Sequence, residues 1–373
     1  MNKDSASVSL ENIVGSVMER HSKYMDKWCY EFGLILKSIE AVYRMNNDSR
    51  YFQYIQQQVD RFISEDGTIL GYDCREFNLD HINPGKMLLF LYQETSEEKY
   101  KTAAHSLRRQ LADQPRNLRG GFWHKGIYPH QMWLDGLYMS SPFLAQYARM
   151  FQEPSAIDDV ENQIALLSKH TRDHATRLLY HAWDESRGMK WSDDTTGCSP
   201  HFWGRAMGWY VMALVDILDY FPDDDPKRPV IIGHFADALK ALLKVQDPVS
   251  GVWYQILDKS HEKGNYLESS ASCMITYALL KAIRLGYLDA SMAVAASKAY
   301  NGILEQFVEV DGENLVNLKN VCSVAGLGGN PFRDGSLAYY FSEPVVSNDY
   351  KGYGPFILAS VEYIRRNERL TPS

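Results

Sequence analysis

The 373-residue sequence has no apolar run that approaches the ~20 residues needed to cross a bilayer. It also has no run of Lys and Arg, and its formal net charge at pH 7 is -8. Proteins that bind nucleic acid through its phosphates need a basic surface, so that class is excluded. We therefore expect neither a membrane nor a nucleic acid as a partner.

Targeting and disulfide signals are missing as well. The first 20 residues, MNKDSASVSLENIVGSVMER, contain one Lys and no uninterrupted apolar stretch, so they indicate neither a signal peptide nor a transit peptide. The cysteines are odd in number and show no CxxC spacing, which is typical of reduced thiols: Cys29, Cys74, Cys198, Cys273 and Cys322. These features predict a cytoplasmic protein.

Several motifs of common catalytic and binding sites are absent from the sequence. There is no HExxH pair and no Cys/His cluster with ligand spacing, so no metal is expected. No GxSxG nucleophile elbow occurs either. The longest glycine-rich stretch, residues 321–336, lacks the GK[ST] ending of a P-loop and resembles a surface loop. We expect no cofactor.

The sequence does contain helical apolar spacing almost from end to end, and two kinds of helix alternate along it. The first kind is amphipathic with one polar face and is predicted at residues 7–22, 50–63, 97–111, 156–173, 228–246 and 289–308. The second kind starts with a polar or aromatic cluster and continues as an apolar body, at residues 28–44, 79–95, 132–151, 201–221, 266–287 and 351–366.

These six pairs predict an all-α fold, an (α/α)6 barrel of six inner and six outer helices. Their spacing is too irregular for a tandem solenoid with a fixed period, whereas a closed ring places protein on all sides of each apolar helix. Small residues four apart, such as Gly204 and Gly208, favour close approach of the inner helices. No linker rich in Pro, Gly or Ser divides the chain, so we expect a single catalytic domain over residues 1–373.

The tryptophans follow the same organisation. All eight fall in the connections that lead into inner helices or in the first turns of those helices: Trp28, Trp123, Trp133, Trp183, Trp191, Trp203, Trp209 and Trp253. An alternating barrel gathers these connections around one mouth, and sugar rings stack on aromatic faces. The tryptophans therefore favour a carbohydrate site, although they would also serve to fill the end of the barrel.

Charged and imidazole groups are predicted at the same end: Asp80, His81, His124, Lys125, His130, Asp135, His181, Asp184, His201, Arg205 and Glu268. Asp80 and Asp135 each stand at the predicted start of an inner helix, where an Asp that merely caps the helix is also common. The aromatic neighbours of Asp135 favour catalysis, because an apolar wall raises the pKa of a carboxyl group towards that of a general acid. Arg205 and Trp209, four apart, share one helical face.

Five segments resemble motifs of the unsaturated rhamnogalacturonyl hydrolases of glycoside hydrolase family 105, which are similar to the unsaturated glucuronyl hydrolases of family 88: GGFWHK, PHQMWLDGLYMSSPF, LLYHAWDES, TGCSPHFWGRAMGWYVM and YLESSASCM. The resemblance implies an (α/α)6 barrel in the cytoplasm that acts on disaccharides left by a rhamnogalacturonan lyase. Their unsaturated galacturonic acid is linked to rhamnose. In the family mechanism an aspartic acid protonates C4, water adds at C5, and opening of the resulting hemiketal releases the neighbouring sugar.

The resemblance also implies roles for individual residues. Asp135 of WLDG matches the proton donor, which also helps to activate the water, and Asp80 matches the second acid of the family. The implied substrate-binding residues are His124, Lys125, Trp133, His181, Arg205 and Trp209. Lys125 and Arg205 suit the uronate carboxylate. The segment WCYEFG and the glycine-rich loop near residue 327 do not match the family pattern.

Three other interpretations stay open at this point. The first is an unsaturated glucuronyl hydrolase that acts on glycosaminoglycan fragments. The second is a sugar epimerase of the same barrel class, which would normally depend on histidine pairs. The third is a non-catalytic sugar-binding barrel, against which the paired acids argue. The sequence predicts no oligomeric state.

Overall fold

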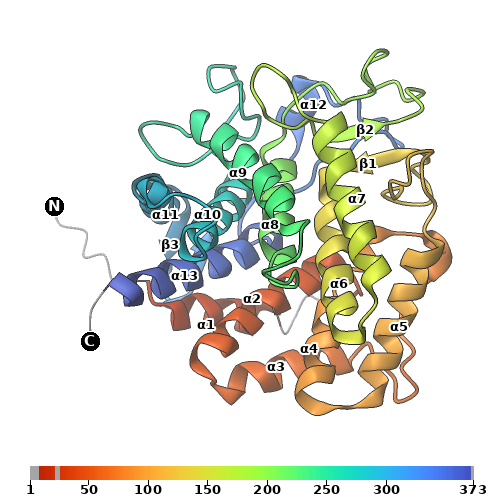
Figure 1. The fold of residues 1–373 in the computed structure, drawn as a ribbon. Coiled ribbons are helices and arrows are strands. Elements are labelled where there is room, and N and C mark those ends of the chain that lie inside the picture. The colour runs from red at the N-terminus through yellow and green to blue at the C-terminus, as the bar shows by residue number, and fades with distance from the viewer. Residues whose placement is uncertain (1–7, 22–25, 371–373) are drawn as a thin grey trace.

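The computed structural model describes residues 8–21 and 26–370 (Figure 1). Residues 1–7, which belong to the N-terminal segment considered above, and residue 22 at the end of the first predicted helix lie outside the described residues. The outer helices are α1 (Leu10–His21), α3 (Ser49–Asp60), α5 (Glu98–Asp113), α7 (Pro154–His170), α9 (Arg228–Lys244) and α11 (Ala293–Phe307). The inner helices are α2 (Tyr30–Asn46), α4 (Gly85–Thr95), α6 (Leu134–Phe151), α8 (Gly204–Ile217), α10 (Ser269–Arg284) and α13 (Tyr350–Leu370).

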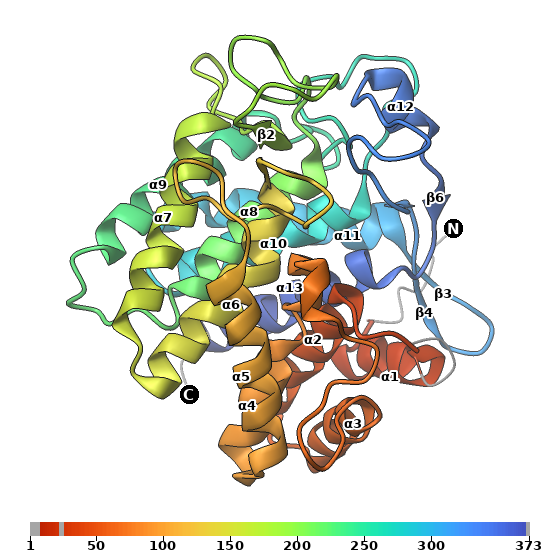
Figure 2. The same cartoon turned by 90° about the vertical axis from the view of Figure 1, so that its right-hand side faces the viewer.

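The inner helices form a closed ring. Each packs against the next in the order α2, α4, α6, α8, α10, α13, and α13 packs back against α2. The outer helices α3, α5, α7, α9 and α11 lie on the inner helices that they neighbour in the chain, and α1 lies on α13. In Figure 2 the outer helices α3, α7 and α9 lie at the edge of the molecule. The predicted (α/α)6 barrel is confirmed.

Short strands and one extra helix occupy the connections. Antiparallel pairs join β1 (Gln131–Trp133) to β2 (Ala182–Asp184), β3 (Val308–Val310) to β4 (Val316–Leu318) and β5 (Val321–Cys322) to β6 (Val345–Val346). The helix α12 (Leu337–Ser342), which the sequence did not predict, lies between α11 and α13. In Figure 1, β1, β2 and α12 lie at the upper end of the barrel. This end carries the connections that lead into the inner helices.

One predicted inner helix is broken near its start. Residues 79–95 were expected to form a single helix, but Leu79–His81 form a separate 3-10 turn and α4 begins at Gly85. The reason is Pro84, which has no N–H to donate to the carbonyl of Asp80 and whose ring would clash with that carbonyl in a continuous helix. Asp80 therefore lies on a short turn outside α4.

The close approach of α8 and α10 depends on glycine. A Cβ at Gly208 would lie 2.8 Å from the Cβ of Met274, and one at Gly204 would lie 3.0 Å from the Cβ of Ala271. These separations leave no room for a side chain, so the two glycines have the packing role that the sequence predicted. No described helix combines the length and the apolar character that a bilayer crossing requires.

Two buried lysines on the inner helices differ in their partners. Lys281 Nζ lies 2.8 Å from Asp216 and 2.6 Å from Asp219. Lys86 Nζ lies 4.1 Å from the centre of the Tyr138 ring and has no hydrogen-bond partner among the described residues. Burial accordingly lowers the pKa of Lys86 to about 7, whereas the two carboxylates raise the pKa of Lys281 well above its ordinary value despite its burial.

We expect Lys86→Met to stabilise the protein, and more at pH 6 than at pH 9. Below about pH 7 the ammonium is charged in both the folded and the unfolded state, so its burial costs most there. Between about pH 7 and pH 10.5 the folded state has lost the proton that the unfolded state still holds, so the cost falls as the pH rises. The free energy of unfolding in urea at the two pH values measures the effect.

The matched control is Lys281→Met. It leaves Asp216 without its ammonium partner and should lower the free energy of unfolding at both pH values, by about 3 to 5 kcal/mol as for other broken buried pairs. A Lys86→Met protein that is destabilised to the same degree would show that Lys86 contributes a stabilising contact.

Candidate active site

The pairing of β1 with β2 brings Asp135 and His181 together. Trp133, the last residue of β1, lies opposite Ala182, and the backbone N–H of Leu134 donates to the carbonyl of His181 at 3.1 Å. The chain then enters α6, so the side chain of Asp135 lies beside the imidazole of His181, the residue that precedes β2. The Asp135 Oδ2 and His181 Nε2 atoms are 3.3 Å apart.

The second acid, Asp80, lies beside residues 124 and 125, which precede β1. The N–H of Leu79 donates to the carbonyl of His124 at 3.2 Å, which places the 3-10 turn of Asp80 beside the segment of His124 and Lys125. Lys125 Nζ is 2.6 Å from Asp80 Oδ2, and His124 Nε2 is 3.8 Å from Asp80 Oδ1. The site therefore contains two carboxylate and imidazole pairs, of which one also has an ammonium group.

The Trp133 ring lies between the two imidazoles. It is stacked on His124 with ring centres 4.7 Å apart and planes inclined by 11°, and it meets His181 edge-on at 5.3 Å. The centre of the Trp203 ring also lies 4.7 Å from that of His181, with the planes inclined by 47°. These ring contacts restrict the orientation of both imidazoles. Among the described residues, no group of three His, Cys, Asp or Glu is arranged to hold a metal ion.

Solvent reaches the carboxylates but not the imidazoles. The side chains of Asp80 and Asp135 are 15% and 14% exposed, whereas those of His124 and His181 are 4% and 0% exposed. A molecule that enters from solvent therefore meets the two acids first. The sequence assigned both histidines to substrate binding, but the geometry suits them to holding the carboxylates from behind.

Burial and neighbouring charges determine the ionisation of Asp80 and of His124 beside it. Burial acts to raise the pKa of Asp80, but the nearby Lys125 ammonium holds it below its ordinary value. Burial lowers the pKa of His124 to about 4, so its imidazole is neutral at neutral pH. Asp80 and Lys125 thus form an ion pair at neutral pH, and Asp80 is poorly suited to donate a proton. Asp135 forms no ion pair with a Lys or Arg among the described residues.

Neither acid caps a helix. The N-cap residue of α6 is Trp133, and no backbone N–H of the described residues donates to the Asp135 carboxylate. In the 3-10 turn the capping side chain is Asn78, whose Oδ1 accepts the N–H of Asp80 at 3.0 Å. The alternative explanation, in which Asp80 and Asp135 serve only as helix caps, is therefore not supported.

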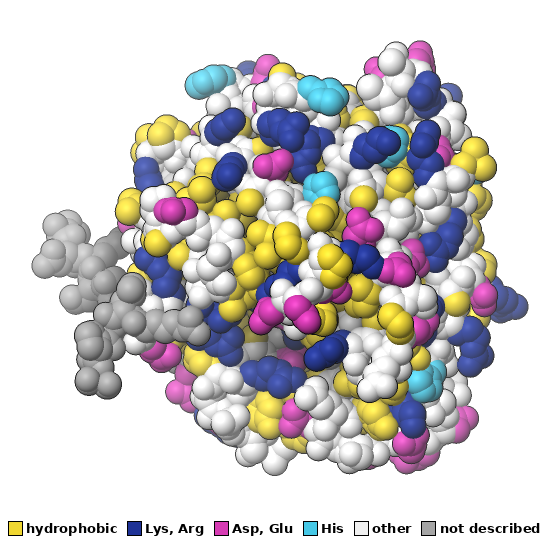
Figure 3. Space-filling model, viewed as in Figure 1, with side chains coloured by type: hydrophobic (Ala, Val, Ile, Leu, Met, Phe, Trp, Pro, Cys, Tyr) yellow, Lys and Arg dark blue, Asp and Glu magenta, His cyan; other side chains and the backbone are white. Residues whose placement is uncertain are grey.

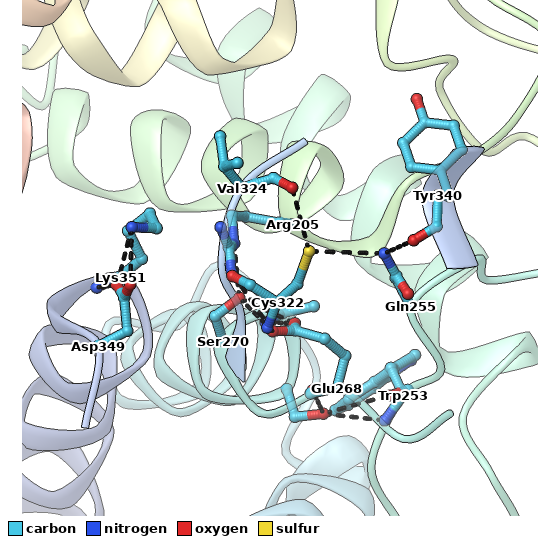
Figure 4. Close-up of polar contacts among 12 residues, drawn as sticks. Arg205, Trp253, Gln255, Glu268, Ser270, Cys322, Val324, Tyr340, Asp349 and Lys351 are labelled. Carbon is cyan, nitrogen blue, oxygen red and sulfur yellow. Dashed lines mark hydrogen bonds and ion pairs between the residues drawn. The ribbon is translucent and has the colours of Figure 1, made fainter. Parts of the chain in front are cut away.

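Arg205 lies deeper than the sequence suggested. Its guanidinium is 2% exposed, donates to Ser270 Oγ at 2.7 Å and to the carbonyl of Cys322, and pairs with Glu268 at 3.4 Å (Figure 4). Trp209 is 1% exposed and is stacked on Tyr138 with ring centres 4.9 Å apart. Both residues are buried, and the charge of Arg205 is met by protein groups.

The tryptophans serve mainly as packing at the mouth. Seven of the eight are buried, and Trp253, for example, donates its indole N–H to the carbonyl of Leu242 at 2.8 Å. Trp123 is half-buried and lies beside His130, with ring centres 5.0 Å apart. The alternative interpretation, in which tryptophans fill the end of the barrel, thus describes most of them, while Trp133 lies between the two acid and histidine pairs.

Sequence reasoning missed three tyrosines at the site. The Tyr340 hydroxyl lies 2.8 Å from His181 Nδ1 and comes from α12. The Tyr128 ring is stacked on Trp133 with centres 5.1 Å apart, and its hydroxyl accepts a hydrogen bond from Arg333 of the glycine-rich loop at 3.1 Å. Tyr30 of WCYEFG meets Trp209 edge-on. The sequence signals were the position of Tyr128 within the connection that carries His124 and that of Tyr30 within WCYEFG, a segment that does not match the family pattern.

Comparisons with known proteins agree with this geometry. The model of Glycosyl Hydrolase Family 88 matches residues 9–367. A solved structure of a glycoside hydrolase from Family 105 of C. acetobutylicum ATCC 824 is 49% identical, with a TM-score of 0.94, over 95% of this chain and 99% of that chain. Protein Atu3128 of Agrobacterium fabrum is 40% identical over 60% of this chain and 97% of its own length.

A further relative has a named activity. The unsaturated rhamnogalacturonyl hydrolase YesR of Bacillus subtilis is 28% identical over 76% of this chain and 79% of its own length. The family match and the 49% identity each cover most of the chain, as the motif resemblance does. The chain therefore belongs to the glycoside hydrolases matched by the Family 88 model and, among them, to Family 105.

Proposed function

We propose that the protein hydrolyses disaccharides in which 4,5-unsaturated galacturonic acid is linked to rhamnose, the products of a rhamnogalacturonan lyase, in the cytoplasm and without a cofactor. The observation that carries the proposal is the pair of partly exposed acids with different partners, Asp135 on His181 and Asp80 on Lys125. The activity named for YesR supports this class of substrate. The small oligosaccharide is the only partner that the proposal requires.

In the proposed reaction the glycosidic bond breaks indirectly. Protonation of C4 of the enol ether places positive charge on C5 and the ring oxygen, and a water molecule then adds to C5. The resulting hemiketal opens to a ketone at C5, and the hemiacetal left at C1 releases the neighbouring sugar. One water molecule is consumed, and no bond is made between enzyme and sugar. This differs from direct displacement at the anomeric carbon.

Asp135 is the proposed proton donor. We assign to His181 the tautomer in which Nδ1 accepts the hydrogen of the Tyr340 hydroxyl, so that the ring proton is on Nε2, 3.3 Å from Asp135 Oδ2. After the proton has moved to C4, this N–H stabilises the carboxylate that remains. The same carboxylate is then able to accept a proton from the water that adds to C5.

Asp80 and Lys125 have a different proposed role. Lys125 carries an ammonium group that is 24% exposed and suits the uronate carboxylate of the substrate. Ionised Asp80 positions Lys125 and is able to accept a hydrogen bond from a sugar hydroxyl or from the water. We propose that Arg205 and Trp209 support the unsaturated ring from beneath, Trp209 as the floor of the site and Arg205 by fixing the segment around Cys322.

Asp135→Asn should fold normally and lose activity by at least about 100-fold, because an amide does not deliver a proton to C4. The loss of ultraviolet absorbance of the double bond measures the rate, and a thermal midpoint checks the fold. Asp113→Asn, at an exposed end of α5, is the matched control and should keep the wild-type rate. Asp135→Asn activity above about a tenth of wild type would remove Asp135 from this role.

The same assay distinguishes the substrates. We expect a higher kcat/KM for the unsaturated rhamnogalacturonan disaccharide than for an unsaturated chondroitin disaccharide. The reverse preference would identify an unsaturated glucuronyl hydrolase. Binding of both sugars with no loss of absorbance would identify a non-catalytic barrel or an epimerase.

Asp80→Asn should lower kcat/KM by about tenfold or more, which corresponds to a loss of ~1.4 kcal/mol of transition-state stabilisation. It should also move the alkaline limb of the pH profile to lower pH. Burial acts to lower the pKa of Lys125, and the charge of Asp80 raises it; without that charge the ammonium loses its proton earlier as the pH rises. A variant that changes only the thermal midpoint would give Asp80 a structural role.

Tyr340→Phe should lower kcat by about five- to tenfold, with KM little changed, since one hydrogen bond to His181 of about 1 kcal/mol is lost. Tyr339→Phe in the same helix is the control, because its hydroxyl accepts the N–H of Gly326 and makes no hydrogen bond to His181. Equal losses of kcat in the two variants would show that α12 acts through its packing alone.

A further inference from the structure

Gly136 is a glycine that its own helix does not require. It directly follows Asp135 in the first turn of α6 and is buried beneath the surface, on which Figure 3 shows charged and apolar side chains mixed together. Its φ lies outside the left-handed region, so an alanine would adopt the same backbone. Because glycine loses more conformational freedom on folding than alanine does, it disfavours a helix. The proposed reaction gives Gly136 no role, so the missing side chain needs a reason outside the helix.

The imidazole of His124 supplies that reason. A Cβ at position 136 would lie 2.8 Å from His124 Nδ1 and 3.2 Å from Leu79 Cδ1. The Leu79 methyl group ends a flexible side chain, whereas Nδ1 belongs to a rigid ring. Protein interiors are packed so closely that one added methyl group is felt. An alanine at position 136 therefore requires either the ring of His124 or the first turn of α6 to move.

Packing alone holds the imidazole of His124 in place. It is buried and forms no hydrogen bond among the described residues. The Trp133 ring is stacked on it, and the Tyr128 ring lies parallel to it with centres 6.4 Å apart. With no hydrogen bond to fix it, the ring takes its position from the surfaces around it, and Gly136 is one of those surfaces.

The opposite side of the ring faces the second acid. His124 Nε2 lies 3.8 Å from Asp80 Oδ1, and Asp80 Oδ2 lies 2.6 Å from Lys125 Nζ. The stacked Trp133 hinders a tilt, so a ring displaced from Gly136 slides in its own plane towards Asp80. There its nitrogen competes with Lys125 for the carboxylate. A side chain at position 136 would thus disturb the ion pair that the proposed function assigns to the uronate of the substrate.

We propose that Gly136 is a positioning residue of the reaction, which acts by giving the His124 imidazole its place between the first turn of α6 and Asp80. The turn that carries Asp135 thereby also keeps Asp80 on Lys125. The effect of Gly136 on the reaction rests on the proposed function, whereas its contact with His124 does not.

Gly136→Ala should raise KM for the unsaturated disaccharide by about fivefold or more and leave kcat within about twofold of wild type. The uronate binds more weakly, whereas the surroundings of Asp135 are kept. The alkaline limb of kcat/KM should also move to lower pH, because an Asp80 carboxylate drawn towards the imidazole raises the pKa of Lys125 less strongly. A purely structural contact would leave that limb in place.

The control is Gly233→Ala on the exposed side of α9, where an added Cβ has nothing within 4 Å. It should raise the thermal midpoint slightly and keep the wild-type kcat and KM. Gly136→Ala should lower the midpoint in the wild-type background but not in His124→Ala, which leaves room for the new methyl group. The midpoints need no substrate, so failure of the proposed function alone would leave this coupling between positions 124 and 136 intact.

Each of three results would overturn the role proposed for Gly136. Wild-type KM and a wild-type pH profile in Gly136→Ala would show that the ring has not moved. A fall of kcat with unchanged KM would place the displacement at Asp135 instead of at His124. An equal fall of the midpoint in the wild-type and His124→Ala backgrounds would show that the methyl group meets something other than the imidazole.

Discussion

The packing of α13 against both α10 and α2 is the constraint on which the rest of the structure depends. It closes the ring, so every connection into an inner helix emerges at the same end. The connections that precede α4, α6 and α8 thereby become neighbours although they are far apart in the chain. Only then does β1 pair with β2, which sets Asp135 against His181, and only then does Asp80 reach Lys125.

The different roles proposed for the two acids rest on their different partners. A carboxylate 2.6 Å from an ammonium group is held ionised, which suits it to positioning and to accepting hydrogen bonds. A carboxyl group beside a buried imidazole has no such fixed positive charge and is able to exchange a proton with substrate and water. The Trp133 ring separates the two pairs, so each acid keeps its own surroundings at a short distance from the other.

The sequence predicted what local patterns determine. Helical periodicity located six pairs of helices, and the motifs located Asp80, Asp135, Lys125 and Trp133 at the mouth. The sequence interpretation placed Arg205 at the substrate because Arg205 and Trp209 share one face of a predicted helix. The partners of Arg205 could not be predicted, because Glu268, Ser270 and Cys322 lie more than 60 residues away in the chain. Tyr340 and α12 were missed for the same reason, since a six-residue helix has too little periodicity to be seen.

The buried polar contacts around Arg205 connect the segment around Cys322 and Tyr340 to Asp135, the proposed proton donor. Glu268 accepts the N–H of Cys322 at 2.9 Å, and Gln255 donates to the carbonyl of Tyr340, also at 2.9 Å (Figure 4). Tyr340 in turn holds His181, which faces Asp135. The segment between β5 and β6 also contains the glycine-rich loop, whose Leu327 packs on Trp133. Buried contacts thus hold both ends of this segment and, through Tyr340, keep His181 beside Asp135, whereas the tip of the segment, residues 329–332, is exposed to solvent.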